Sequence, residues 1–310
     1  MDRFYDRDQA ATRLEELASE RRKVLSGRVN SSAVHMADLE PDDIRVIELT
    51  EGKKSWRLCL QELDDEVSDE LVVRIQGVLT KNNLVPKNTR LCAQQKATLL
   101  TQSAEITGLK TRTFVAAMGN LSSIEQKFGE HLPGIDMVNS DGFTEASTTY
   151  SANNRVFTSQ SDAPHEQDNS FHEGLDPLGH MARLKTGELI HAPENMVRYF
   201  KRAHVKGTDF KYEAHVPGGF KIGDIVEMQV SFVAFSTGNN RVKITSRLQA
   251  ITLLDRKFSK EAAAERRRAR AVEDHSPAIR RKVGYFPEDD DDERKFKKSR
   301  TCSPERERSD

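Results

Sequence analysis

The chain has 310 residues, enough for one large domain or for two small ones with tails. Hydrophobic residues make up 36% of it and charged residues 31%, so we expect a packed core together with a substantial share of disordered sequence. The formal net charge of −1 excludes a global field that attracts nucleic acid or anionic membranes. Any such binding must therefore come from a local patch.

The sequence carries no signal of secretion, membrane insertion or structural zinc. Cys59, Cys92 and Cys302 lie far apart and form no Cys-x-x-Cys pair, which indicates a reducing compartment. The N-terminal segment MDRFYDRDQAATRLEEL lacks the apolar stretch that a signal peptide needs, and no run of about 18 apolar residues occurs. We therefore expect an intracellular protein, nuclear or cytoplasmic, that does not associate with membranes.

Residues 1–40 predict an N-terminal helical arm. Apolar residues recur at close to 3.6-residue spacing from Asp8, which can cap a helix, to Leu25. The apolar stripe is narrow, so this helix can pack either on the core or on a partner helix.

Residues 41–138 predict an α+β unit. Asp43–Leu60 predicts a hairpin around a glycine-containing turn, and Ser68–Leu84 has the apolar spacing of a helix. Thr89–Ile106 favours strands because of its β-branched residues, and Ser122–Phe128 favours a short helix.

Residues 139–180 predict a flexible polar linker or insertion, because Ser, Thr, Asn, Asp and Gly dominate there. A structureless segment this long does not belong inside a compact domain, so it either divides the chain or interrupts one unit. Residues of metal-binding type in or near it are His165, Glu166, Asp168, His172, Glu173, Asp176, His180 and His191. Their spacing matches no known ligand pattern, and a metal site needs rigid support, so we expect no bound metal.

Residues 181–256 predict a unit built around a long β-hairpin, Phe220–Asp255. Both arms alternate apolar with polar residues, and the loop Ser236–Asn240 between them tolerates positive φ angles. Placing Phe235 opposite Arg241 brings the apolar residues of both arms onto one face. A slip by one residue would expose that whole set to water.

The other face of the hairpin is polar and carries Arg241, Lys243 and Arg247. Such a face can bind a phosphate backbone, although a merely solvated face is commoner. The long arms suit a curved sheet. We therefore expect an α+β fold, a twisted antiparallel sheet or small β-barrel built around the hairpin, with peripheral helices and disordered tails. The units 41–138 and 181–256 can share one core or form two.

Basic residues are interleaved with aromatic ones in the segment MVRYFKR upstream of the hairpin. Proteins that bind single-stranded nucleic acid combine these residue types to hold phosphates and to stack bases. Arg198, Lys201 and Arg202 therefore join the predicted binding surface. Core aromatics with basic neighbours that reach into solvent are the commoner arrangement.

Residues 257–310 predict a charged tail that begins as a helix and ends disordered. Residues 256–282 contain ten Lys and Arg against four Asp and Glu. Basic residues at the spacing of a bipartite nuclear import signal are Arg267 and Arg268 and, after eleven further residues, Arg280, Arg281 and Lys282.

Four segments carry a family resemblance: ELIHAPENMVRYFKR, FKIGDIVEMQVSFVAF, LQAITLLD and RRKVGY. Together they resemble, over about residues 181–286, a large group of uncharacterised proteins from basidiomycete fungi. This resemblance implies no activity and no site residues. The GDIV opening and the apolar second arm are also similar to the late strands of phage OB-fold proteins that bind single-stranded DNA.

The sequence contains no GxxxxGK[ST], G-x-S-x-G or H-E-x-x-H motif, so we expect neither enzymatic activity nor a cofactor. The leading prediction is a nuclear module that binds single-stranded nucleic acid on the basic sheet face. The alternative is an adaptor that docks a protein partner, for which Val233, Phe235 and Ile251 on the outer face would be suited. A third hypothesis, which the ligand spacing does not favour, is a metal-dependent enzyme that uses the histidine-rich segment.

Overall fold

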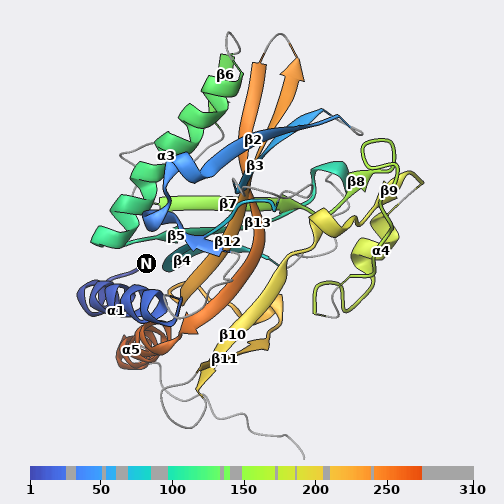
Figure 1. Cartoon of the computed structure of the whole chain (residues 1–310). Helices are drawn as coiled ribbons and strands as arrows, with labels where there is room; N and C mark the ends of the chain where they lie inside the picture. Colours follow the sequence, from blue (N-terminus) through green and yellow to red (C-terminus); the bar gives the residue numbers. More distant parts are fainter. Residues whose placement is uncertain are drawn as a thin grey trace, which may run out of the picture. The chain divides into compact units, whose positions relative to one another are not determined.

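The computed structural model describes residues 1–25, 33–50, 54–60, 69–84, 97–132, 136–139, 149–171, 174–185, 187–204, 210–238 and 241–273. The chain divides into two compact units, Met1–Arg267 and Arg268–Asp310. The sheets and the site described below lie in the first unit. Its fold is α+β and is centred on the long hairpin, which confirms the predicted class (Figure 1).

The strands of the large sheet are β1 (Ala33–His35), β2 (Ile44–Leu49), β3 (Ser55–Leu60), β4 (Val72–Asn83), β5 (Thr101–Thr107), β6 (Asp136–Asn139), β7 (Thr149–Arg155), β10 (Arg198–His204), β11 (Phe210–Ala214), β12 (Ile225–Gly238) and β13 (Arg241–Asp255). A second sheet pairs β8 (Thr158–Ser159) with β9 (Leu189–Ile190). The described α-helices are α1 (Arg7–Leu25), α3 (Arg112–His131), α4 (His180–Leu184) and α5 (Lys257–Glu273). None of these helices is both long and apolar enough to cross a membrane.

Five strands form a closed ring of hydrogen-bonded neighbours, in the order β13, β7, β5, β4, β12 and back to β13. The hairpin arms β12 and β13 have 14 and 15 residues, and each serves more than one neighbour along its length. β12 pairs first with β4 and then with β3, whereas β13 pairs first with β6 and near its end with β10. These successive pairings explain why both arms are so long.

The sequence predicted a twisted antiparallel sheet or a small β-barrel, and the sheet contains parallel pairs as well as antiparallel ones. β6, β7 and β10 all run parallel to β13. They reach it through long stretches of chain, and parallel pairs need such connections because a tight turn can join only antiparallel strands.

From Val230 to the tip, the register of the hairpin differs from the predicted one by two residues. Phe235 pairs with Lys243 and not with Arg241, so both arms extend further toward the tip, where residues 239–240 lie outside the described part. A shift by two residues keeps the side chains of this part on their predicted faces. Between Gln229 and Val230 the register is irregular, so Ile251, predicted on the outer face, pairs with Met228 and is buried. The apolar residues of the first arm are accordingly all buried: Val226, Met228, Val230, Phe232 and Ala234.

One hydrophobic core joins the two units whose independence the sequence left open. Ile75 and Phe128, from the first of these units, belong to the same core as Phe232 and Ile244 of the hairpin. Helix α3 packs on this core along one side of the sheet (Figure 1). Residues 41–138 and 181–256 are therefore parts of one folded body.

The predicted helix over Ser68–Leu84 is wrong, because this segment contains strand β4. Every residue from Val73 to Leu79 is buried. Apolar residues recur at helical spacing from Leu71 to Leu79, which favoured a helix. Val73 and Ile75 also alternate with Arg74 and Gln76, two polar residues that are buried in the strand.

The prediction of a structureless linker over residues 139–180 is also wrong where the structure describes it. Strand β7 lies in this segment and pairs with β5 along its whole length. Tyr150, Ala152 and Asn154 are buried, and the residues between them are half-buried. The polar composition of this segment gave no indication of β7, a strand that is part of the ring.

Helices α1, α3 and α5 lie where the sequence predicted helices, with some changes of extent, whereas no helix was predicted at α4. Helix α3 extends beyond the predicted Ser122–Phe128 in both directions. Helix α5, the predicted start of the charged tail, buries Phe258 and Ala262 in a cluster with α1. Residues 274–310, where the sequence predicts a disordered tail, lie outside the described part of the chain.

Candidate functional site

A cavity of about 590 Å³ lies beside the long hairpin, and we call it the hairpin cavity. Its walls come from β2, β3, β5, β7, β8, β12 and β13, from the connection between β8 and β9, and from the turn Pro193–Asn195. Its lining is rich in neutral polar side chains, among them Ser55, Thr101, Asn153 and Thr245. Both signs of charge are also present.

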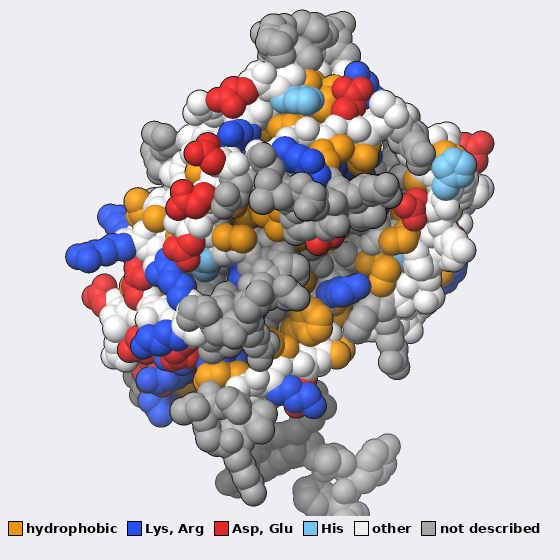
Figure 2. Space-filling model, viewed as in Figure 1, with side chains coloured by type: hydrophobic (Ala, Val, Ile, Leu, Met, Phe, Trp, Pro, Cys, Tyr) orange, Lys and Arg blue, Asp and Glu red, His pale blue; other side chains and the backbone are white. Residues whose placement is uncertain are grey.

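The surface of the molecule has no dominant sign of charge on the described part of the face shown in Figure 2, where Lys and Arg side chains are interspersed with Asp and Glu. This mixture agrees with the net charge of −1. Long-range attraction of an anion is therefore weak, and a charged ligand must be met by local groups.

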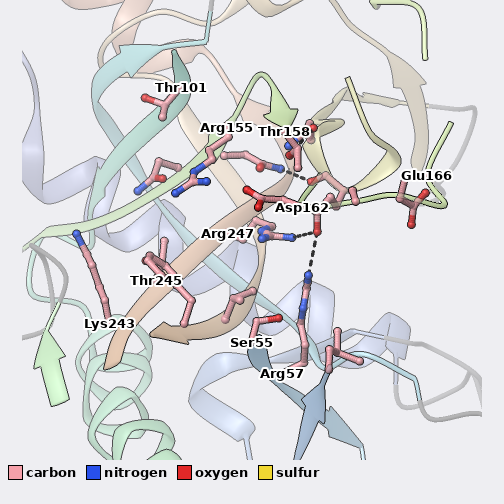
Figure 3. A pocket seen from close by; sticks show the side chains of 18 of the residues that line it. Ser55, Arg57, Thr101, Arg155, Thr158, Asp162, Glu166, Lys243, Thr245 and Arg247 are labelled. Carbon is pink, nitrogen blue, oxygen red and sulfur yellow. Dashed lines mark hydrogen bonds and ion pairs between the residues drawn. The ribbon is translucent and has the colours of Figure 1, made fainter. Parts of the chain in front are cut away.

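Two arginines hold one carboxylate in the hairpin cavity (Figure 3). Arg57 Nη2 lies 2.9 Å and Arg247 Nη1 lies 2.7 Å from the same oxygen, Oε2 of Glu194. Arg57 also pairs with Glu70 at 2.9 Å. The side chains of Arg57 and Arg247 are only 15% and 20% exposed, so this ion cluster is largely shielded from water.

The two guanidinium groups keep Glu194 ionised. Burial by itself would raise the pKa of this carboxyl, but Arg247 and Arg57 outweigh burial and lower the pKa below its ordinary value. Burial and the neighbouring Arg57 lower the pKa of Arg247, which nevertheless stays protonated because a guanidinium does not lose its proton in proteins.

Strand β13 presents its predicted polar face to the hairpin cavity. Lys243, Thr245 and Arg247 line the cavity, whereas Val242 and Ile244, which alternate with them, are buried in the core. The β8–β9 connection and the turn at Glu194 lie across this face. It is therefore one wall of a cavity and not the open platform that the sequence predicted.

Arg155 and Lys243 bring positive charge to the cavity that no described carboxylate neutralises. Arg155 ends β7, and its Cζ lies 6.0 Å from the centre of the Phe235 ring. Lys243 is the cross-strand partner of Phe235. Neither cation forms an ion pair within the described residues, and both lie beside the same half-buried aromatic ring.

The connection between β8 and β9 forms an acidic wall of the cavity. Asp162 and Glu166 line the cavity and are exposed. Figure 3 places Lys243 and Arg155 on the side of the cavity that is distant from Glu166. Arg155 and Lys243 therefore lie on one side of the cavity and Glu166 on the other, with Asp162 between them (Figure 3).

Buried amide side chains fix the turn that carries Glu194. Asn195 Oδ1 accepts hydrogen bonds from Thr158 Oγ1 at 3.0 Å and from the Ala192 amide at 2.9 Å. Asn154 Nδ2 donates to the Glu194 carbonyl at 2.8 Å and to the Leu248 carbonyl at 3.1 Å. These bonds tie the turn to β7, β8 and β13, so Glu194 stands on a rigid support.

The other residues predicted to bind nucleic acid do not join the hairpin cavity. Arg241 and Arg198 are exposed and lie outside its lining. Strand β10 pairs with Ala250–Leu253 near the end of β13, whereas Lys243 is near the start of that strand. The predicted surface is thus divided into two separate groups.

On β10, two of the predicted binding residues are engaged in ion pairs. Lys201 pairs with Glu213 at 3.1 Å. Arg202 pairs with Glu20 at 2.6 Å, and its Cζ lies 3.2 Å from the centre of the Phe210 ring. Arg202 therefore links helix α1 to the sheet.

The apolar residues predicted on an exposed docking face are largely covered. Val233 is buried where β12 pairs with β3, and Ile251 belongs to the hydrophobic core. Phe235 is half-buried in the cavity wall. The prediction of an exposed apolar face is therefore wrong for Val233 and Ile251.

The histidine-rich residues serve local structure where they are described. His191 is buried, its Nδ1 lies 2.8 Å from the Val156 carbonyl, and burial lowers the pKa of its imidazole. Asp168 accepts a hydrogen bond from the His191 amide and forms an ion pair with Lys185. Residues 172–173 lie outside the described part, within which no three potential metal ligands converge.

Sequence reasoning missed five charged residues of the cavity, Glu48, Arg57, Arg155, Asp162 and Glu194. Arg155 and Asp162 lie in the segment predicted as a linker, and Glu194 lies in a turn that carries no periodic pattern. Glu48 and Arg57 lie in the predicted hairpin Asp43–Leu60, to which no site was assigned. Of the predicted import residues, Arg267 and Arg268 lie on α5, and residues 280–282 lie outside the described part.

No protein-family model and no curated protein matches the chain. The resemblances over residues 181–286 therefore stay predictions.

Proposed function

We propose that this protein is a non-enzymatic module that binds single-stranded nucleic acid and holds one nucleotide in the hairpin cavity. The observation that carries the proposal is the placement of Arg155 and Lys243, which have no ion-pair partner among the described residues, beside the Phe235 ring. Phosphate needs cations of this kind, and a base gains about 1–3 kcal/mol by stacking on an aromatic ring.

The size and lining of the cavity favour a nucleotide over a duplex. Cavities that bind small molecules measure about 300–1,000 Å³, and the hairpin cavity of about 590 Å³ falls within this range. A base enters such a space only when it is unpaired and unstacked. The basic residues at Arg267 and Arg268 support a nuclear location, which the distribution of a fluorescent fusion in cells would test.

The test is fluorescence anisotropy of a labelled single-stranded oligonucleotide titrated with the full chain at several salt concentrations. The variants are Arg155→Ala, Lys243→Ala and the double variant, and Lys201→Ala on β10 is the matched control. We expect the double variant to weaken binding at least tenfold and to flatten the salt dependence, by about 0.7 in log–log slope for each lost phosphate contact. The control should change neither quantity.

The same charged tail is present in all of these proteins, so its contribution to binding cancels in the comparison. Equal affinities and equal salt slopes for the wild type and the double variant would overturn the proposal. A duplex that binds as tightly as the single strand would also contradict it.

A protein–protein adaptor remains the second proposal, supported by the strand order of the large sheet. The described order of that sheet ends at β2 and at β11, and Leu49 on β2 is 41% exposed. A strand at the edge of a sheet can pair with an extended peptide. Partners that stay bound after nuclease treatment, and that are lost when Val46 on β2 is replaced by proline, would favour the adaptor.

A further inference from the structure

We infer that the hairpin cavity selects guanine, with the Glu194 carboxylate reading the base edge. This inference rests on the proposed function, and it adds a base preference that the proposed function does not require. It starts from the hydrogen-bonding capacity that the Arg57–Glu194–Arg247 cluster leaves unused.

Only one oxygen of Glu194 is occupied. Both Arg57 Nη2 and Arg247 Nη1 donate to Oε2, and within the described residues Oε1 has no hydrogen-bond partner. The side chain is 32% exposed and lines the cavity, so Oε1 is available to a ligand. An ionised carboxylate can only accept hydrogen bonds.

A second carboxylate adds to the hydrogen-bond-accepting character of the cavity. Asp162 also lines the cavity, and its side chain forms no hydrogen bond or ion pair with the described residues. A ligand that covers Oε1 of Glu194 and the Asp162 carboxylate must therefore offer donors to both. A ligand that presents acceptors to them would leave charged groups desolvated and unpaired, which costs far more than a missing contact.

Guanine is the base whose edge meets this requirement. Its N1–H and N2–H₂ groups are adjacent donors, which match an edge of the cavity that offers only acceptors, Oε1 of Glu194 and the Asp162 carboxylate. Adenine and cytosine place a ring acceptor beside their amino group, and uracil and thymine flank a single N–H with two carbonyl oxygens. A site built from acceptors discriminates against each of these edges.

The polarity of the cavity orients the nucleotide in the same way. Arg155 and Lys243 lie near the hairpin and away from Glu166 on the acidic wall (Figure 3). A nucleotide whose phosphate meets these cations turns its base toward the carboxylates. In this arrangement Arg155 and Lys243 bind the phosphate, and the carboxylates contact the base.

The experiment is calorimetric titration of the full chain with mononucleotides that differ only in the base edge. GMP is compared with IMP, which lacks the N2 amino group, with N1-methyl-GMP, which lacks the N1 proton, and with AMP, CMP and UMP. We expect GMP to bind at least about tenfold more tightly than each of the others. This series uses only the wild-type protein, so no folding defect can obscure it.

Two variants assign the preference to residues. Asp162→Asn, at an exposed position, should reduce the ratio of GMP to IMP affinity several-fold, and Glu194→Gln should abolish the preference for GMP. Urea unfolding establishes whether Glu194→Gln remains folded. If Glu194→Gln does not fold, the wild-type series and Asp162→Asn test the guanine preference.

The two proposals fail in distinguishable ways. Equal affinities for all the mononucleotides, together with a loss of oligonucleotide binding in the Arg155→Ala/Lys243→Ala variant, would overturn the guanine preference and leave the proposed function standing. Absence of binding to any nucleotide or oligonucleotide would overturn both. A preference for GMP that persists unchanged in both carboxylate variants would remove Glu194 and Asp162 from the assignment.

Discussion

Glu194 shows how one side chain can determine the properties of a cavity wall. Its carboxylate balances Arg247, which has no other ion-pair partner among the described residues, and it shares Arg57 with Glu70. A buried charge that loses its partner is strongly destabilising, because neither water nor protein then compensates it. The stability of the fold therefore depends on the protonation state of this residue.

Glu194→Gln is expected to lower the free energy of unfolding at pH 7 by about 3 kcal/mol. Because the folded state lowers the pKa of Glu194, its contribution is complete above the unfolded-state pKa of about 4.3 and is lost as the pH falls through the lower folded-state value. The difference between wild type and variant should thus shrink in acid. Urea unfolding at a series of pH values measures it.

The control for this series is Glu213→Gln, which removes one partner of the exposed pair with Lys201. Exposed ion pairs contribute little, so this change should alter stability by no more than about 0.5 kcal/mol at any pH. A stability difference for Glu194→Gln that stays constant into strong acid would show that its charge is not the cause.

At the scale of the elements, two glycines lie in opposite environments, one in the turn before helix α3 and one within the helix. A Cβ added to Gly108, just before the helix, would lie 1.9 Å from Cγ of the buried Phe114. A Cβ added to Gly119, within the helix and exposed, would meet no atom within 4 Å. The first position needs glycine because of the close contact between the turn and the helix, and the second does not.

Gly108→Ala is expected to destabilise the protein by about 1–3 kcal/mol, because Phe114 must leave its place in the core. Gly119→Ala should stabilise it by about 0.4–1 kcal/mol, because alanine restricts the unfolded chain and favours helix. Thermal unfolding of both variants beside the wild type tests this opposition. If both variants shifted the melting temperature in the same direction, the close contact between Gly108 and Phe114 would not be what requires glycine there.

The elements also show which parts of the fold follow from sequence. The faces of β12 and β13 were predictable from Val230 to the tip because a period of two places each side chain, but the register irregularity at Gln229, which turns Ile251 inward, was not. Strand β4 was not predictable, because its apolar residues match the spacing of a helix and its polar residues Arg74 and Gln76 are buried. The cavity was not predictable either, since Arg155 and Glu194 meet Lys243 and Arg247 only through tertiary contacts.

At the scale of the whole molecule, the shared core implies a single cooperative transition for the unit Met1–Arg267. Scanning calorimetry should give one peak whose calorimetric enthalpy equals its van't Hoff enthalpy. The fragments 1–138 and 181–267, expressed separately, should not fold, because each lacks strands of the ring. Two peaks, or a folded fragment 1–138, would contradict a single core.

The closed ring has a consequence for how the protein is made. Strands β3, β4, β5 and β7 leave the ribosome well before β12 and β13, yet the ring closes only when the hairpin pairs with β4 and β7. Until then the nascent chain carries strands whose final neighbours do not exist, and such edges invite aggregation. A pause in translation between β7 and β12 should therefore be harmful, and we expect the nascent chain to need chaperones until Asp255 has emerged.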